Sequence, residues 1–338
     1  MTYSFRWMQE DVPGAGWQEL FESTWPSYQK WFLKSGDAAR PELSVCRKAL
    51  TRYMPELVPT WERLGHLAGG NVRVARMLSL YCPAPYVVGC SQAVWTGSEP
   101  LLVRNYDYHP DAFEGVAVHT QWNDTRVMGV SDCLWGLLDG MNEHGLVAAL
   151  AFGGRKDVGV GFGIPLILRY VLETCHTVDE AVAVLERVPS HMSYNVLLTD
   201  MTGDHVVVAV APDRSTTVER RAFCTNHQDG TGWARYLEVT RSFERERRLE
   251  SLMGDPAMTS AELIRSFLKD PLYSKEHARG FGTLYTTVYR PRAGRMSCLW
   301  PDRSVDQDFD DYEPQEIEVE TPDSPTDSQA ESRPSESA

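Results

Sequence analysis

The spacing of hydrophobic residues changes from helical to strand-like near Tyr86, and this change divides the chain into two parts. Before Tyr86, apolar side chains recur at the spacing of amphipathic helices. Three such helices are expected over residues 43–53, 55–67 and 71–81. After Tyr86, short apolar runs alternate with turn residues, which predicts strands. The chain therefore joins a helical segment to a sheet-rich segment, which favours an α+β fold with sheets and helices in layers.

The sheet-rich segment interrupts its strands with pairs of helices. Helices are expected over 164–175, 178–188, 242–253 and 260–268. Strands are expected over 92–95, 101–108, 116–122, 126–130, 133–138, 146–152, 194–199, 205–211, 216–221, 283–289 and 296–300. The sequence contains neither GxGxxG nor GxxxxGK[ST], so the glycine loops of nucleotide-binding folds are missing.

The negative charge of the chain is concentrated at its C-terminal end. Residues 302–338 contain 13 acids and 2 bases, a net charge of −11. The remaining 301 residues carry only −3 of the total of −14. A nearly neutral body with an acidic end argues against nucleic acid as a partner, because phosphates need a basic face. The segment 302–338 also lacks apolar periodicity, so we expect a disordered tail.

The seven cysteines do not form the pattern of a disulfide framework. Their number is odd, they are scattered, and no CxxC is present. The first residues lack the apolar core of a signal peptide, and no apolar run is long enough to cross a membrane. A reducing cytoplasmic location is therefore expected. The histidines show no metal-ligand spacing, so no metal is expected.

One cysteine, Cys90, stands where strands begin, directly after Gly89. A hairpin that turns near Gly97 would bring Arg104 and Asp107 back toward it. An arginine favours the thiolate form, and a carboxylate can orient a nearby amine or imidazole. The residues themselves leave alternatives open. The pair could be an ordinary salt bridge of a hairpin, and a papain-like pairing of Cys90 with His227 or His205 is another reading.

Several motifs in this order resemble the isopenicillin-N acyltransferase-like group of the Ntn-hydrolase superfamily, to which the bile-salt hydrolases are related. The resemblance covers roughly residues 40 to 300. It rests on Gly89-Cys90, Leu102-Val103-Arg104-Asn105-Tyr106-Asp107, Asp139-Gly140-Met141-Asn142-Glu143-His144-Gly145-Leu146, Cys224-Thr225-Asn226-His227, Ser242-x-x-Arg245-x-x-x-Leu249, Gly282-Thr283-Leu284-Tyr285, and Val288 before Pro291. The resemblance implies an αββα sandwich and activation by self-cleavage.

In this resemblance Cys90 attacks the carbonyl of Gly89, becomes the new N-terminus, and uses its own α-amine as base. Arg104 and Asp107 would hold and polarise Cys90. Asn226 would donate its amide to the oxyanion, and Arg245 would complete the polar cluster. The implied parts are a helical segment 1–89, a catalytic domain 90–301 and the tail 302–338, with the cleaved fragments 1–89 and 90–338 remaining associated. No cofactor is implied.

The implied activity is hydrolysis of a small amide, or transfer of its acyl group to an amine, through a thioester on Cys90. One departure concerns the strand that carries a second oxyanion asparagine in bile-salt hydrolases, where this chain has Ala151. A backbone N–H would then serve instead. The alternative from another class is a non-catalytic relative that keeps the fold as a binding or scaffold protein. Neither reading fixes the oligomeric state.

Overall fold

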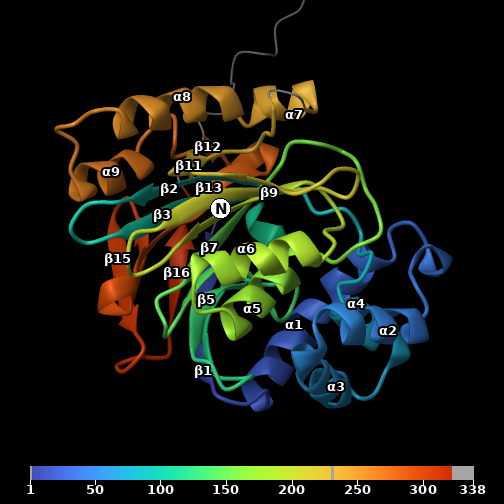
Figure 1. Ribbon diagram of the computed structural model, residues 1–338. Coiled ribbons are helices and arrows are strands. Elements are labelled where there is room, and N and C mark those ends of the chain that lie inside the picture. Colours follow the sequence, from blue (N-terminus) through green and yellow to red (C-terminus); the bar gives the residue numbers. More distant parts are fainter. Residues whose placement is uncertain (1, 230–231, 322–338) are drawn as a thin grey trace, which may run out of the picture.

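The computed structural model describes residues 2–229 and 232–321, and two sheets packed face to face form the centre of this part (Figure 1). The larger sheet contains, in spatial order, β10 (Thr217–Glu219), β9 (His205–Val210), β8 (Tyr194–Thr199), β7 (Val147–Phe152), β6 (Gly136–Asn142), β5 (Val127–Asp132), β4 (Val116–Thr120), β1 (Thr2–Glu10) and β16 (Gln315–Glu320). The smaller sheet contains β11 (Phe223–Cys224), β2 (Gly89–Trp95), β3 (Leu101–Tyr108), β13 (Phe281–Arg290), β14 (Arg295–Trp300) and β15 (Arg303–Asp308), with β12 (Lys275–Glu276) beside β13.

Helices cover both outer faces of this pair of sheets. The helices of the described residues are α1 (Ala15–Phe32), α2 (Leu43–Tyr53), α3 (Val58–Leu67), α4 (Val72–Leu78), α5 (Ile164–Thr174), α6 (Val178–Arg187), α7 (Ala234–Val239), α8 (Ser242–Met253) and α9 (Ser260–Phe267), of which α1–α4 form a group at one side of the sheets (Figure 1). Helices α8 and α9 pack on β2 and β3, whereas α5 packs on β6 and β7 of the larger sheet (Figure 1). The four layers are therefore helix, sheet, sheet and helix, which is the αββα sandwich expected. None of the helices in the described residues is long and apolar enough to span a membrane.

Local sequence explains where several helices begin. Thr177 precedes α6, and its hydroxyl accepts a hydrogen bond from the backbone N–H of Glu180. Thr259 and Glu262 form a reciprocal capping box at the start of α9. These caps satisfy backbone donors that a helix cannot pair internally. Both helices were predicted from the sequence, and each begins at the residue that follows its capping threonine.

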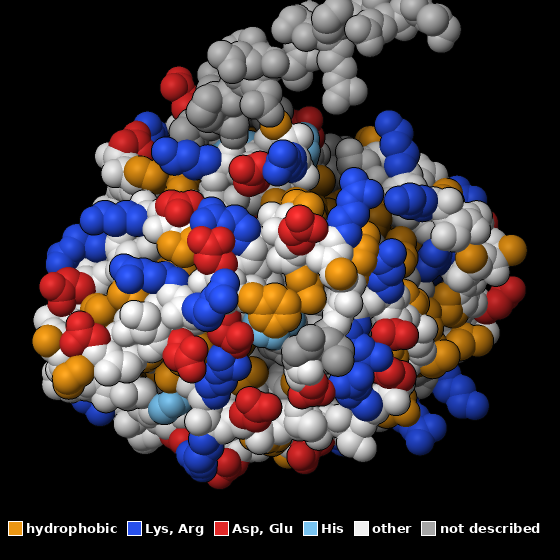
Figure 2. Space-filling view, turned by 90° about the horizontal axis from the view of Figure 1, so that it is seen from above, with side chains coloured by type: hydrophobic (Ala, Val, Ile, Leu, Met, Phe, Trp, Pro, Cys, Tyr) orange, Lys and Arg blue, Asp and Glu red, His pale blue; other side chains and the backbone are white. Residues whose placement is uncertain are grey.

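The outer face formed by α7, α8 and α9 carries charges of both signs. Figure 2 shows basic and acidic side chains interspersed with apolar ones over this face. Arg241, at the start of α8, illustrates the arrangement, because it pairs with both Glu244 and Asp270 at 2.6 Å. Such exposed pairs contribute little to stability. They leave this face without a large region of one charge sign.

The expectation of a disordered tail from residue 302 is wrong for the described residues up to 321. β15 pairs with β14 at the edge of the smaller sheet, and β16 pairs with β1 at the edge of the larger sheet. In β16 the apolar side chains of Ile317 and Val319 alternate with exposed acids. Alternation of this kind is the pattern of an edge strand with one buried face. The remaining residues of the proposed tail, 322–338, lie outside the described residues.

The segment 1–89 is also not purely helical. It begins with β1, which lies between β4 and β16 inside the larger sheet and pairs in parallel with β4. Phe5 and Trp7 of β1 are buried in the core between the sheets. The proposed boundaries at residues 89 and 301 therefore do not separate independent layers, because all three proposed parts contribute strands to the sheets.

Candidate active site

Cys90 is the second residue of β2, and its side chain faces the interior between the two sheets. β2 and β3 form the predicted hairpin, with Cys90 opposite Tyr106 and Gln92 opposite Arg104. Cys90 and Gln92 are two residues apart on β2, so their side chains point to the same face of the sheet. Directly opposed residues of an antiparallel pair also share a face, so Arg104 lies on the same face as the thiol. Its Nη2 donates to Cys90 Sγ at 3.3 Å. The relation of Arg104 to Cys90 expected from the hairpin is therefore present.

A buried network fixes the guanidinium of Arg104. Its Nη1 lies 2.6 Å from Asp139 Oδ2 and donates to the Tyr285 hydroxyl at 2.9 Å. Its Nε and Nη2 donate to the carbonyl of Leu150. The hydroxyls of Tyr285 and Tyr289 in turn donate to the two oxygens of Asp139. Every partner is buried, so the guanidinium is held in one orientation toward the thiol.

Asp107 lies on the opposite face of the hairpin, beside the peptide that precedes Cys90. It is paired in register with Gly89, and a Cβ at Gly89 would lie 3.0 Å from Asp107 Cβ. This distance is shorter than most real Cβ contacts, so a side chain at position 89 would crowd Asp107. Thr283 Oγ1 donates to Asp107 Oδ1 at 2.6 Å, and Arg245 Nη1 lies 3.6 Å from Asp107 Oδ2. Asp107 therefore flanks the Gly89–Cys90 bond, whereas Arg104 contacts the thiol.

Asn226 and Arg245 meet at the backbone of Cys90. The backbone N–H of Cys90 and Nη2 of Arg245 both donate to Asn226 Oδ1, each at 2.8 Å. Asn226 Nδ2 therefore points the other way, toward the carbonyls of Val88 and Phe152 at 3.4 and 3.2 Å. Arg245 Nη1 also donates to the carbonyl of Cys90. All four predicted partners thus lie around Cys90: Arg104 at its thiol, Asn226 and Arg245 at its backbone, and Asp107 beside Gly89.

The residues just before Cys90 are held in place by side chains of the neighbouring elements. The Tyr236 hydroxyl donates to the carbonyl of Val88, and the Tyr194 hydroxyl donates to the carbonyl of Tyr86 at 2.7 Å. Cys90 itself is 0% exposed. In the intact chain the thiol is therefore closed off from solvent.

Burial controls protonation at this site. It raises the pKa of the Cys90 thiol to about 11, although the positive charge of Arg104 opposes the shift. Burial also raises the pKa of Asp107, and Arg245 and the hydrogen bond from Thr283 oppose that shift. The thiol is consequently protonated at neutral pH in the intact chain. A base is needed to take its proton.

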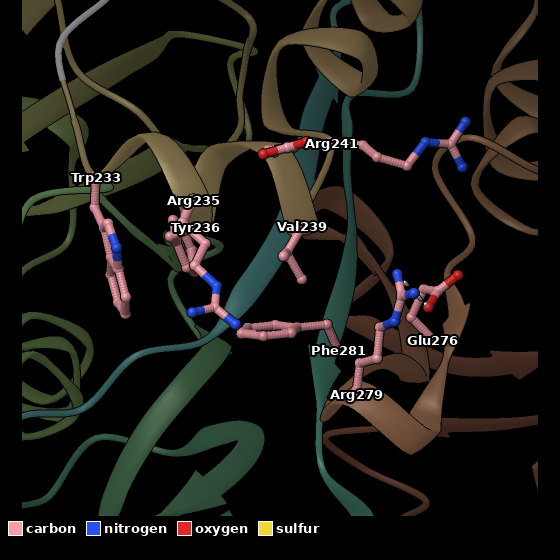
Figure 3. A pocket seen from close by; sticks show the side chains of 9 residues that line it. Trp233, Arg235, Tyr236, Val239, Arg241, Glu276, Arg279 and Phe281 are labelled. Carbon is pink, nitrogen blue, oxygen red and sulfur yellow. Dashed lines mark ion pairs between the residues drawn. The ribbon is translucent and has the colours of Figure 1, made fainter. Parts of the chain in front are cut away.

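A cavity of about 750 Å³ lies next to this segment, beneath α7. Figure 3 shows Trp233, Tyr236 and Val239 on one side of it, facing Phe281 and Arg279 on the other. Tyr236 connects the cavity to the segment before Cys90, since it lines the cavity and its hydroxyl contacts the Val88 carbonyl. The cavity has room for a small molecule close to Cys90.

The papain-like alternative does not fit the geometry. The ring of His227 lies between Ser242 Oγ and Glu246 Oε2, at 2.9 and 2.8 Å from its two nitrogens. His205 lies on β9, where its Nδ1 contacts the carbonyl of Gly203. Both imidazoles are thus engaged away from the Cys90 thiol. Within residues 2–229 and 232–321, no group of three His, Cys, Asp or Glu residues could hold a metal ion.

Sequence reasoning missed the role of Asp139 and its two tyrosines. Asp139 appeared only as part of a motif, although it stands between the apolar residues Leu138 and Met141 of a strand that is buried throughout. A charge in such a position requires a buried partner of opposite sign. That rule would have connected Asp139 with Arg104.

At Ala151 the structure shows regular pairing with Asn195 of β8.

A family model described as acyl-coenzyme A:6-aminopenicillanic acid acyl-transferase matches residues 94–304. The chain belongs to this family. The match spans the hairpin partners of Cys90 together with Asn226 and Arg245, and it begins four residues after Cys90. Membership of this acyltransferase family supports an enzyme that acts on C–N amide bonds, and confirms the resemblance seen in the sequence.

Several solved structures are similar to the chain at low sequence identity. Penicillin V acylase from Agrobacterium tumefaciens is 17% identical, with a TM-score of 0.45 over 65% of this chain and 86% of that chain. A mutant of the conjugated bile acid hydrolase from Clostridium perfringens is 14% identical, with a TM-score of 0.41 over 70% of this chain and 98% of that chain. The Caenorhabditis elegans ortholog of N-acylethanolamine-hydrolyzing acid amidase is 18% identical, with a TM-score of 0.44 over 60% and 92%. No curated protein matches the sequence.

Proposed function

We propose that the chain is an N-terminal-nucleophile enzyme that activates itself by cleaving the Gly89–Cys90 bond. The observation that carries this proposal is the convergence of Arg104, Asp107, Asn226 and Arg245 on Cys90 and the residue before it. Four polar side chains from three separated segments would be costly to bury around an ordinary strand residue. Their burial there is explained when the bond itself reacts.

The self-cleavage step is an acyl shift from nitrogen to sulfur. The Cys90 thiol, after losing its proton, attacks the carbonyl carbon of Gly89. The bond from this carbon to the Cys90 nitrogen breaks, and the nitrogen takes up a proton. Water then hydrolyses the resulting thioester, giving the carboxylate of Gly89 and a free thiol. Asp107 flanks the bond that breaks, and Arg104 stabilises the thiolate that forms.

The mature site would use the new α-amine of Cys90 as its general base. An unperturbed α-amine has a pKa of about 8, so it can take the thiol proton near neutral pH. Asn226 Oδ1, which accepts from the Cys90 nitrogen in the intact chain, would orient this amine. Asn226 Nδ2 would donate to the oxyanion of the substrate in the place now occupied by the Val88 carbonyl.

The reaction would transfer the acyl group of a small amide to the Cys90 thiol and release its amine. Water as the second acceptor makes the enzyme an amide hydrolase, and an amine makes it an N-acyltransferase. The cavity beneath α7 offers the space for a substrate, bounded by the aromatic rings of Trp233, Tyr236 and Phe281. A cytoplasmic location is part of the proposal. All seven cysteines lie within the described residues and are free, which suits a reducing compartment.

Intact-mass spectrometry of the purified, denatured protein tests the proposal. We expect two species, and N-terminal sequencing of the larger should read Cys-Ser-Gln-Ala-Val, the sequence that starts at Cys90. The Cys90→Ala chain should stay intact. A single uncut mass for the wild-type chain, under conditions where the protein is folded, would instead favour a non-catalytic relative that binds or scaffolds.

A further inference from the structure

A second cavity lies on the other side of the segment that precedes Cys90. Its volume is about 340 Å³, and it is bounded by α1, by this segment and by the ends of β3 and β5. Five aromatic side chains line it, from Tyr28, Trp31, Tyr86, Tyr108 and Phe113. Aromatic faces of this kind attract organic cations as well as apolar groups. Among the described residues that line this cavity there is no Lys or Arg.

A buried carboxylate, Asp132, and a half-buried one, Glu114, lie in the wall of this cavity. Asp132 ends β5, and Glu114 precedes β4. The hydroxyl of Tyr28 lies 2.5 Å from Glu114 Oε1 and 2.7 Å from Asp132 Oδ1. A single hydroxyl proton cannot be donated to both carboxylates at once. Asp132 is only 3% exposed, and its second oxygen has no hydrogen bond within the described part of the chain.

The carboxyl groups of Asp132 and Glu114 have no Lys or Arg beside them among the described residues that line the cavity. Burial and the nearby charge of Asp132 raise the pKa of Glu114 to about 7. Burial also raises the pKa of Asp132, while the hydroxyls of Tyr86 and Tyr28 partly offset this. A cation placed between the carboxylates would stabilise their charged forms. The wall of the cavity therefore ends in a pair of carboxyl groups whose charged forms a bound cation would stabilise.

The cavity is connected to the nucleophile through two tyrosines. The hydroxyls of Tyr86 and Tyr106 lie 2.5 Å apart, and Tyr106 is the residue directly opposite Cys90 on β3. In the proposed self-cleavage, the residues before Cys90 form the acyl group that is transferred to the thiol. The side chain of Tyr86, which lines the cavity, therefore lies on the acyl side of the reaction.

We propose that this cavity is the subsite for the acyl group of the substrate, and that Asp132 and Glu114 select an acyl group that ends in a protonated amine. The inference rests on the proposed function and names the substrate class, which is an aminoacyl amide. The ammonium group would approach the carboxylates of Glu114 and Asp132 from the cavity, and its alkyl or aryl stem would lie among the aromatic rings.

The first test measures binding alone, so it does not depend on turnover. Phenethylammonium and the neutral 2-phenylethanol are titrated calorimetrically into the full-length Cys90→Ala chain, which keeps the cavity as it is in the intact protein. We expect saturable binding of the cation, with the alcohol at least about tenfold weaker. Asp132→Asn, added to this chain, should weaken binding of the cation about tenfold. Asp11→Asn removes an exposed acid outside the cavity and should not change it.

The thermal melt of each variant, followed by circular dichroism, shows whether the variants are folded, and Glu114→Gln is the second variant if Asp132→Asn does not fold. Equal affinity for the cation and the alcohol, or no saturable binding of either, would overturn the inference. So would retention of full affinity in folded Asp132→Asn or Glu114→Gln, because the carboxylates would then have only a structural role.

The second test uses the processed wild-type enzyme and the p-nitroanilides of 6-aminohexanoic and heptanoic acid, which differ by NH₃⁺ in place of CH₃. We expect a higher kcat/KM for the charged substrate, and a loss of this preference of about tenfold in Asp132→Asn. A preference that the substitution does not alter would show that the cavity is not the acyl subsite. Absence of turnover with an uncut chain would contradict the proposed function, while the binding test would still decide whether the cavity takes cations.

Discussion

The backbone N–H of Cys90 donates to the side-chain oxygen of Asn226 across 2.8 Å, although the two residues are 136 positions apart. Arg245 donates to the same oxygen, so the amide has a fixed orientation. Because the oxygen is held by two donors, the amide nitrogen must face the carbonyls on the other side. The residue proposed to stabilise the oxyanion is therefore oriented in the intact chain, before any bond is cleaved.

Replacing Asn226 by alanine should lower kcat and kcat/KM together. A donor that meets charge only as it develops contributes mainly to the transition state, and its loss costs about 10²–10³ in other oxyanion holes. The measurement is steady-state kinetics on the fully processed variant, with its processing confirmed by mass. If stably folded, processed Asn226→Ala turned over at the wild-type rate, the oxyanion assignment would be withdrawn.

Asp107→Asn should slow both self-cleavage and turnover. The substitution keeps the size of the side chain and an oxygen that can accept from Thr283, but removes the charge beside the Gly89–Cys90 bond. The uncut fraction is followed by gel electrophoresis after expression, and turnover is measured on the cut fraction. A purely structural role predicts a different result, namely a lower melting temperature with normal activity in the folded fraction.

Asp139→Asn should destabilise the fold by about 3–5 kcal/mol, since it leaves the buried guanidinium of Arg104 without its ionic partner. Tyr289→Phe is the matched control in the same network. It removes one hydrogen bond to Asp139 and should cost about 1 kcal/mol. Denaturant unfolding of both variants, in a Cys90→Ala background that avoids cleavage, measures the difference. Equal costs for the two would argue against an ionic contribution.

Deletion of β16 should destabilise the protein, because it removes the partner of β1 and uncovers the edge of that strand. A chain ending at residue 314 is compared with one ending at residue 321, which keeps β16. We expect a lower melting temperature for the shorter chain than for the longer. The same melting temperature for both would mean that β16 contributes nothing measurable to the sheet.

Self-cleavage should become faster as the pH rises from 6 to 9. The thiol pKa is raised to about 11 in the intact chain, so the thiolate is the minor form throughout this range. Below the pKa, the thiolate fraction increases about tenfold for each pH unit. Chains synthesised in vitro and transferred into buffers of different pH would show the rate as loss of the uncut band. A rate independent of pH would mean that deprotonation does not limit cleavage.

Elements with a strong local pattern could be predicted from the sequence. The helix at 43–53 and the helix at 242–253 have the expected bounds, since amphipathic spacing and local end signals determine them. The strands β1 and β16 were missed because each is stabilised by a partner at the other end of the chain. Composition also misled, because an edge strand with alternating acids has the composition of a disordered tail.

In the site, too, local contacts could be predicted from the sequence, whereas contacts between distant segments could not. The hairpin brings Arg104 and Asp107 close to Gly89-Cys90, as turn spacing predicts. Their placement on opposite faces also follows from strand alternation. The contact of Asn226 with Cys90 could not be derived from spacing, since it joins β2 to the loop that follows β11. It entered only through the resemblance. Asp139 was missed because its partner lies in the other sheet.

The position of β1 inside the larger sheet has a consequence for the order in which the protein matures during synthesis. The ribosome makes β1 first, yet its neighbour β16 is made last, and β4 comes between them in time. Asn226 and Arg245 likewise emerge long after the bond that they surround. The residues that surround Cys90 therefore come together only after Arg245 has been synthesised. If the Gly89–Cys90 bond is cleaved as proposed, the fragment 1–89 still contributes β1 between β4 and β16, so its strand pairing would keep the two fragments together.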